Sequence, residues 1–279
     1  MSTTTLGPPV RIDGPYPQPP RFRLVDVATI VPEAEDYWMS GAQVQAYPPD
    51  LPHTWNPCTP SESTGTKEEG GLIPAPLFGA FTAYLAETCT SRGIVSEEQF
   101  TARALAAFGA VESYAVELEF SQGLSMTANP FLADADADIL TSGPTGIRAG
   151  MALLEEAIGA TGRAGVIHLT PGAATAARSE HLVDSDGTYL RTILGTPVVV
   201  GDGYIGAVPD GEDAPDLAES WAFATGPVQI RRSDIFINPP TLAEALDREI
   251  NQVTYRAERY YLVDWDTALQ AAILLDWTA

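Results

Sequence analysis

Three glycines in the segment VVVGDGYIG have the spacing of a dinucleotide-binding motif. Gly201, Gly203 and Gly206 spell G-x-G-x-x-G directly after a run of valines, which favours a β-strand. In nucleotide-dependent enzymes this motif joins the strand to a helix whose N-terminus holds the pyrophosphate, and an acidic residue follows about 20 positions later. The chemistry to test is therefore phosphate binding at the start of a helix.

The residues after the motif argue against that chemistry. Pro209 and Pro215 stand where the helix would run, and proline there removes a hydrogen-bond donor and clashes with the preceding turn. The chain has no lysine or arginine between Arg191 and Arg231, and the charged residues in that interval are all acidic: Asp202, Asp210, Glu212, Asp213, Asp216 and Glu219. We therefore predict a glycine-rich turn that leads into an acidic surface loop, with no cofactor bound.

The other candidate catalytic residues are scattered along the chain, which has three histidines. His168 lies in the apolar run VIHL, which is typical of a buried histidine with its hydrogen bonds made. His53 stands alone in a proline-rich segment. Ser179, Glu180 and His181 are adjacent, but adjacency in sequence does not produce the geometry of a catalytic triad. We expect no catalytic site from these residues.

The sequence signal for a metal site is equally weak. Asp134, Asp136 and Asp138 alternate as at the start of a calcium loop, but such a loop needs glycine at its sixth position and glutamate at its twelfth. Those positions hold Ile139 and Thr145, so we interpret the run as a polar loop edge or an acidic strand. The two cysteines, Cys58 and Cys89, form neither a disulfide framework nor a zinc site, and we expect reduced thiols and no metal.

Composition limits the class of protein further. With 279 residues, of which 45% are hydrophobic, the chain can build one large or two modest domains. A net charge of −22 opposes binding to phosphate backbones. Lys67 is the only lysine among 15 basic residues, and the arginines that make up the rest suit fixed ion pairs at interfaces. Neither a signal peptide nor a membrane span is predicted.

The elements that must position these residues follow from local patterns. Residues 1–71 are rich in proline with scattered aromatics, which indicates an ordered extended arm that lies over its own domain or over neighbours. A flexible polar stretch and a β-like run then suggest a long two-stranded loop. Ser96 and Gln99 form a capping box that predicts a helix over 96–122, about 40 Å long and closed by Gly123. Its predicted inner stripe is Phe100, Ala104, Phe108, Val111, Ala115 and Leu118.

The remaining elements alternate between helix and strand. Helices are predicted over about 144–160, over 171–179 with Thr170 as the cap, and over 241–252 with Thr241 and Glu244 as a capping box. Short strands are predicted over 164–170, 253–263 and 271–276.

Three segments, in this order, resemble the major capsid proteins of tailed bacteriophages, which have the Hong-Kong-97-like fold shared with encapsulins. The first is Gly146–Ala177, a helix followed by VIHLTPGAATAA. The second is LGTPVVV, which begins at Leu194. The third is Ser233–Leu274, where Arg256 to Arg259 spell R-A-E-R. Tyr260 follows that motif where the family often has arginine, and the similarity covers roughly residues 90–279.

The resemblance implies an α+β phage-capsid fold with named parts. These are an N-terminal arm at 1–59, an extended loop at 60–95, a spine helix at 96–123, a peripheral domain at 124–181 and 241–279, and an axial domain at 182–240. Some members of the family cross-link their shells covalently through a lysine of the extended loop. Lys67 is the only candidate here, and Glu68 and Glu69 beside it favour its charged, unreactive form.

The resemblance also implies a function without catalysis. The expected role is a structural major capsid protein that self-assembles, as hexamers and pentamers, into an icosahedral head shell around phage double-stranded DNA. The expected partners are further copies, a separate scaffolding protein and a portal, with the DNA enclosed but not read and no membrane. The expected location is the virion, after assembly in the host cytoplasm. The alternatives are an encapsulin-type shell, a tail-tube or head-completion protein, and an enzyme.

Overall fold

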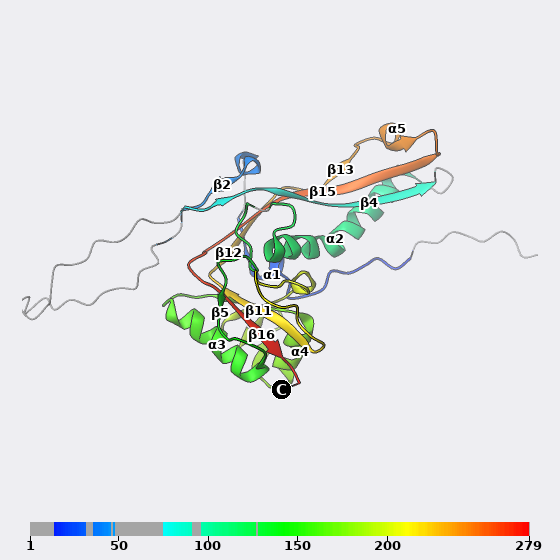
Figure 1. The fold of residues 1–279 in the computed structure, drawn as a ribbon. Helices are drawn as coiled ribbons and strands as arrows, with labels where there is room; N and C mark the ends of the chain where they lie inside the picture. Colours follow the sequence, from blue (N-terminus) through cyan, green and yellow to red (C-terminus); the bar gives the residue numbers. More distant parts are fainter. Residues whose placement is uncertain are drawn as a thin grey trace, which may run out of the picture.

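The computed structural model describes residues 14–31, 36–45, 47, 75–90, 96–126 and 128–278, and the fold is α+β as predicted. His53, Cys58 and Lys67 lie outside the described residues. Two mixed sheets lie one above the other in Figure 1, and the long helix α2 (Glu97–Gln122) runs along the upper one. The upper sheet is called the β15 sheet below, and the lower one the β16 sheet.

The β15 sheet is built around its longest strand, β15 (Gln252–Trp265). On one edge β15 pairs antiparallel with β4 (Phe81–Thr90) over the whole length of β4. The other edge of β15 pairs with three short strands, one of which, β12, also pairs in parallel with β1. The three strands that pair with β15 are β12 (Val228–Arg232), β13 (Phe236–Asn238) and β14 (Leu246–Asp247). Strand β1 is Thr29–Ile30.

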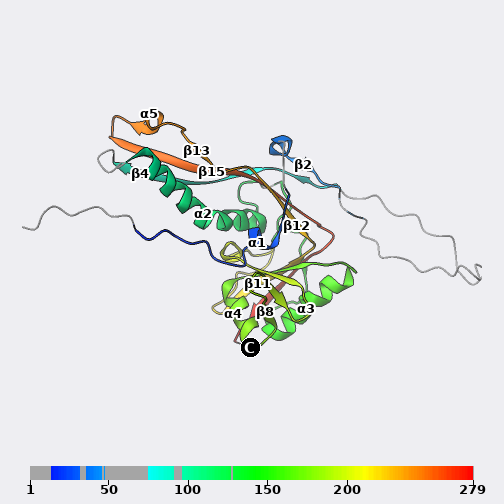
Figure 2. The ribbon, with the colours of Figure 1, turned by 180° about the vertical axis from the view of Figure 1, so that it is seen from behind.

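The β16 sheet is centred on β11 (Glu219–Thr225) and β16 (Gln270–Asp276), which pair antiparallel. Helices α3 (Ile147–Ala160) and α4 (Pro171–Ser179) pack on this sheet, as Figure 2 shows from behind. The other strands of the sheet are β5 (Asp138–Ile139), β6 (Thr145–Gly146), β7 (Val166–Leu169), β8 (Val183–Ser185), β9 (Leu190–Thr192) and β10 (Pro197–Val200).

Helix α2 has the predicted ends but only half of the predicted inner stripe. The Ser96 hydroxyl accepts from the backbone N–H of Gln99 at 3.1 Å, and Gly123 closes the helix at φ 60°. The stripe is confirmed in the first half, where Phe100, Ala104 and Phe108 are buried, but Val111 is 45% exposed. In the second half the buried positions include Val116, Glu117, Glu119, Phe120 and Ser121, because the short helices α1 (Leu24–Val27) and η4 (Asp202–Tyr204) also pack there.

The predicted helix over 241–252 is wrong for most of its length. Only α5 (Leu242–Ala245) is helical, and the Thr241 side chain makes no capping hydrogen bond. The chain then turns through Asn251, whose φ is 57°, so that β14 pairs with the start of β15. Strand pairing has overridden local helix propensity here. Helix α3 likewise begins at Ile147, since residues 145 and 146 pair with β16 as β6.

The N-terminal arm contributes to the core of its own chain. Residues 24–27 form the short helix α1 (Leu24–Val27), and the Leu24 side chain is fully buried. Strand β1 then adds to the β15 sheet through β12. After the 3₁₀ turn η1 (Asp36–Ser40), β2 (Ala42–Gln43) pairs antiparallel with β3 (Leu77–Phe78).

The sheets divide the chain differently from the predicted loop and domains. Strand β4 was expected in the extended loop at 60–95, but it is a full strand of the β15 sheet. Residues 147–179, expected with the peripheral segment 241–279, pack with residues 183–225 on the β16 sheet. The expected axial segment 182–240 is shared, since β12 and β13 belong to the β15 sheet. Sequence order could not show that the chain crosses repeatedly between the two sheets.

Candidate functional site

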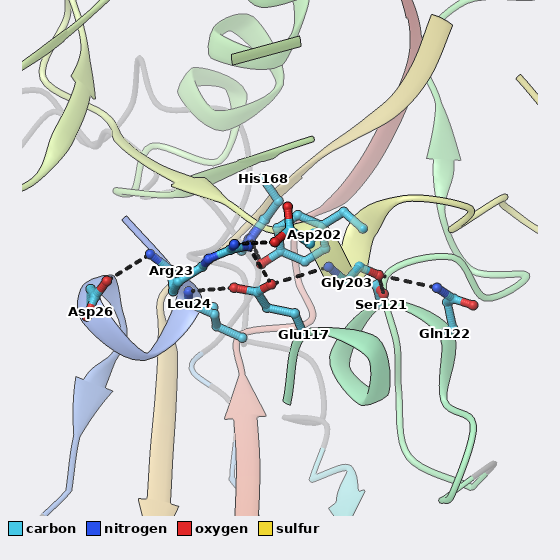
Figure 3. A network of polar contacts seen from close by, with 10 residues as sticks. Arg23, Leu24, Asp26, Glu117, Ser121, Gln122, His168, Asp202 and Gly203 are labelled. Atoms are coloured by element: carbon cyan, nitrogen blue, oxygen red, sulfur yellow. Dashed lines mark hydrogen bonds and ion pairs between the residues drawn. The ribbon is translucent and has the colours of Figure 1, made fainter. Parts of the chain in front are cut away.

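A buried cluster of charged groups joins the arm, the long helix and the loop after β10, as Figure 3 shows. Arg23 directly precedes α1, Glu117 lies near the C-terminal end of α2, and Asp202 begins η4. The Arg23 and Glu117 side chains are almost inaccessible, with 6% and 0% of their surface exposed, whereas Asp202 is at the rim. The cluster therefore connects three distant segments at one point.

Glu117 is the centre of the cluster. Its Oε2 accepts from Arg23 Nη1 at 3.3 Å and from the Gly203 N–H at 3.3 Å, and its Oε1 accepts from the Leu24 N–H at 3.3 Å. Arg23 also donates to the Asp202 carboxylate through Nη2. Two carboxylates thus share one guanidinium, and removal of one member of such a buried pair typically costs about 3–5 kcal/mol because a charge is left unpaired.

The glycine motif exists to let the loop after β10 approach α2. A Cβ on Gly203 would lie 2.5 Å from the Glu117 Cβ and 2.6 Å from the Leu118 backbone nitrogen. A Cβ on Gly201 would lie 2.8 Å from the Glu117 carboxyl carbon, and Gly206 has φ +82°. The predicted glycine turn after a strand is confirmed, and only a 3₁₀ turn, η4, follows it.

The same loop is fixed to α2 by hydrogen bonds. The Gly203 carbonyl accepts from the Ser121 hydroxyl at 2.9 Å and from the Gln122 side-chain amide at 3.2 Å, as drawn in Figure 3. The motif therefore presents its polar groups to a helix of its own chain, where a nucleotide-binding fold would present them to phosphate.

His168 on β7 lies beside this cluster and is fully buried, as predicted. Its Nδ1 is 3.1 Å from the Tyr204 hydroxyl and its Nε2 is 2.9 Å from the Thr225 hydroxyl. Because the Thr225 hydroxyl donates to the Gly226 carbonyl, Nε2 is the ring nitrogen that carries the proton, and Nδ1 accepts from Tyr204. A neutral imidazole satisfies both contacts.

Burial shifts the pKa values of three side chains around the loop. Burial raises the pKa of Glu117 from 4.5 to about 7, although Arg23 and the two backbone N–H groups act against the rise. Burial lowers the pKa of His168 from 6.5 to about 3. Burial, and then the charge of Glu117, raise the pKa of Tyr204 well above 10. Such shifts can mark catalytic groups, but the Glu117 and His168 side chains have no surface that a substrate can reach.

The remaining candidates from the sequence do not come together. Ser179 donates to the backbone of its own helix, and Glu180 pairs with Arg148 at 2.6 Å. His181 is exposed at a left-handed turn, φ 59°. Neither Ser179 nor Glu180 is therefore arranged with His181 as a triad.

The aspartate run is a turn. Asp134 accepts from the Asp136 N–H at 3.0 Å and from the Gln270 side chain at 2.6 Å, which makes it a turn residue. Asp138 begins the short strand β5. Among the described residues, no group of three or more histidine, cysteine, aspartate or glutamate side chains is placed to hold a metal ion, and no helix is long and apolar enough to cross a membrane.

The R-A-E-R segment of β15 fastens the sheet to α2. Arg259 donates to both oxygens of Glu112 at 3.1 and 2.8 Å, and the Tyr261 hydroxyl donates to the same carboxylate at 2.5 Å. Ala257 is fully buried, and Arg256 pairs with Glu258 in its own strand. These residues hold the long helix to the long strand.

We expect no binding of NAD, FAD or ATP. Gly201 and Gly203 are buried against Glu117 of α2, and Arg23, which contacts Glu117 and Asp202, is already shared by these two carboxylates. Calorimetric titration of the purified protein should show no binding tighter than about 100 µM, or about −5.5 kcal/mol. A tighter dissociation constant for any of the three would contradict this account of the loop.

No protein-family model matches this sequence, and no curated protein matches it. Solved structures do match. A structure from Gordonia phage Cozz has a TM-score of 0.56 at 12% identity, over 98% of this chain and 92% of that one. The capsid of an empty GTA particle has a TM-score of 0.53 at 14% identity, and the match covers 99% of this chain and 93% of that one. The SrpI encapsulin complex from Synechococcus elongatus PCC 7942 has a TM-score of 0.55 at 12% identity, and the match covers 96% of this chain and 92% of that one.

This chain has the phage-capsid fold. The matches confirm the fold expected from the sequence, including its occurrence in encapsulins. In a capsid fold the buried cluster acquires a structural meaning, because it ties the arm to the long helix and to the β16 sheet. Sequence reasoning missed Arg23 and Glu117. The sequence did show charged residues, Glu117 and Glu119, between the apolar positions 116 and 120, but this pattern does not distinguish one glutamate from the other.

Proposed function

We propose that the chain is a structural major capsid protein that self-assembles into the icosahedral head shell around phage double-stranded DNA. The observation that carries this proposal is a fold match over more than nine-tenths of both chains, with a particle capsid among the matches. The charge supports it, because a net charge of −22 keeps enclosed DNA from adhering to the shell. The partners proposed are further copies arranged as hexamers and pentamers, a separate scaffolding protein and a portal.

The two sheets suggest a revised division of the subunit. We infer a peripheral domain made of α2 with the β15 sheet, and an axial domain made of the β16 sheet with α3 and α4. One cluster of buried apolar side chains lies between the β16 sheet and its helices α3 and α4, and a second cluster joins α2 and the β15 sheet to the other face of the β16 sheet. The buried cluster around Glu117 would then fasten the arm and the axial domain to the spine helix. No enzymatic activity is proposed.

The test is assembly of the purified chain, alone and with candidate scaffolding proteins. Negative-stain micrographs should show closed shells of uniform size, and virions assembled in the host should contain this chain and nuclease-protected DNA. Rings or tubes would favour a tail-tube or head-completion protein. Failure to assemble under every condition would contradict the proposal.

An encapsulin-type shell is the second candidate, favoured by the match to the SrpI complex. Shells of that type would contain a cargo protein in place of DNA. Mass spectrometry and nucleic-acid staining of particles purified from the native host distinguish the two contents.

We expect the shell to be held together without covalent links. Lys67 is the only lysine, and its acidic neighbours Glu68 and Glu69 oppose the neutral amine that an isopeptide bond needs. Particles boiled in denaturing detergent should give a single band near the 29.7 kDa monomer. A ladder of oligomers that disappears in Lys67→Ala would contradict this expectation. A ladder that disappears only with reductant would instead indicate disulfides through Cys58 or Cys89.

A further inference from the structure

Strand β4 has a long edge without a partner strand. Its ten residues extend about 34 Å at about 3.4 Å per residue. One edge pairs with β15 at every position from Phe81 to Thr90, and within the described part of the chain no strand pairs with the other edge. The N–H and C=O groups on such an edge are a template for a further strand.

The sequence of β4, FTAYLAETCT, lacks the usual protection of an exposed edge. Edges that stay free in solution carry lysine, proline or a bulge, and β4 has no lysine, arginine, proline or glycine. Its one charged residue, Glu87, binds Arg103 of α2 at 2.9 Å. The side chains on the outer face are exposed and uncharged, and they are rich in residues that favour strands: Thr82, Tyr84, Ala86 and Thr88.

The arm of the same chain lies close to this edge without pairing with it. Residues 14–17 and the strand residues 85–87 line a groove of about 240 Å³ together with α2. Pro15 and Pro17 have no N–H to donate, and the Tyr16 side chain is 57% exposed. The groove therefore leaves the polar backbone of the β4 edge available to another chain.

We propose that the free edge of β4 pairs with an extended segment of a second copy of this chain, so that a continuous sheet crosses the subunit interface. This inference rests on the proposed shell function. Charge favours contact between two copies at this edge. Subunits with a net charge of −22 repel each other, and this repulsion is smallest where the exposed side chains are uncharged, as they are on β4. Main-chain hydrogen bonds supply the affinity, as in other strand-addition interfaces.

The pairing predicts an alternating pattern of amide exchange. Successive residues of a strand direct their N–H groups to opposite edges, so one alternate set in 82–88 bonds β15 and the other set faces the free edge. In unassembled subunits the second set should exchange rapidly. In particles made from this chain alone it should exchange at least about tenfold more slowly, which corresponds to about 1.4 kcal/mol of protection. The first set should be protected in both states.

Residue-resolved hydrogen exchange on subunits and particles is the decisive measurement. Protection of the alternate set in particles of this chain alone, together with rapid exchange in unassembled subunits, supports the proposal, because a strand supplied by the same chain would protect the set in both states. Particles that form while this set still exchanges rapidly would overturn the inference and leave the shell function intact. If no particles form, both fall together.

A matched pair of variants tests the same edge independently. Ala86→Lys places a charge on β4, whereas Ala214→Lys makes the same change in an exposed loop. Both should fold with the thermal midpoint of the wild type, and only Ala86→Lys should lose particle yield, by about tenfold. Equal yields from the two variants would overturn the proposal.

Discussion

Gly203→Ala is expected to destabilise the protein by about 3 kcal/mol, the upper part of the range for overpacked core positions. The added methyl would lie 2.5 Å from the Glu117 Cβ and 2.6 Å from the Leu118 backbone nitrogen. Neither atom can move without displacing α2. Relief of the clash must therefore separate η4 from the helix and lengthen the 3.3 Å contact between Gly203 N–H and Glu117. The result would be a cluster with one fewer donor to its carboxylate.

Gly109→Ala is the matched control for that substitution. Gly109 lies in α2, the helix against which Gly203 packs, with no atom within 4 Å of an added Cβ, so alanine should stabilise by about 0.5–1 kcal/mol through helix propensity. Urea unfolding of the two variants and the wild type gives both free energies. A Gly203→Ala protein as stable as Gly109→Ala would show that the loop does not need its close approach to the helix.

The glycine motif also shows what the sequence could and could not reveal. Prolines after Gly206 were enough to predict a turn without a long helix behind it. They could not show why glycine is required, because the atoms that exclude a side chain belong to residues 117 and 118. The ends of α2 were predictable since Ser96 and Gly123 act locally, within one turn of the helix.

Features that depend on distant segments were the ones missed. The pattern at 241–252 is a good local helix, and it gave way to a hairpin because β15 offers a paired strand. The Arg23–Glu117 pair joins residues 94 apart in sequence, and nothing in either local pattern identifies the other. Strands from both halves of the chain enter each sheet, and no local pattern identifies their partners.

A fall in pH should change the stability of the folded protein through two buried groups, His168 and Glu117, whose effects have opposite signs. His168 has a pKa of about 3 in the folded protein and 6.5 as its ordinary value, so between these values the unfolded chain binds its proton and the folded one does not. Stability from this residue is therefore lost as the pH falls below 6.5. Glu117 has a pKa of about 7 against an ordinary 4.5, so the folded state binds the extra proton, and stability from this residue is lost as the pH rises from 4.5 to 7.

The two effects overlap between pH 4.5 and 6.5, where they largely cancel in the wild type. Each contributes about 1.4 kcal/mol for each pH unit, or about 3 kcal/mol across that window. We expect single variants to reveal them. As the pH falls from 6.5 to 4.5, the stability of the wild type relative to His168→Gln should fall by about 3 kcal/mol. Relative to Glu117→Gln it should rise by about as much.

Urea unfolding of the three proteins at several pH values in this window measures both differences. The slopes, and not the absolute stabilities, carry the test, because glutamine at either position also disturbs hydrogen bonds to Tyr204, Thr225, Leu24 or Gly203 at every pH. Arg23, Asp202 and Tyr204 face the same cluster and are unchanged in both variants. Two slopes of the same sign would show that burial does not control one of the two groups, and two flat differences would show that folding shifts the pKa of neither group.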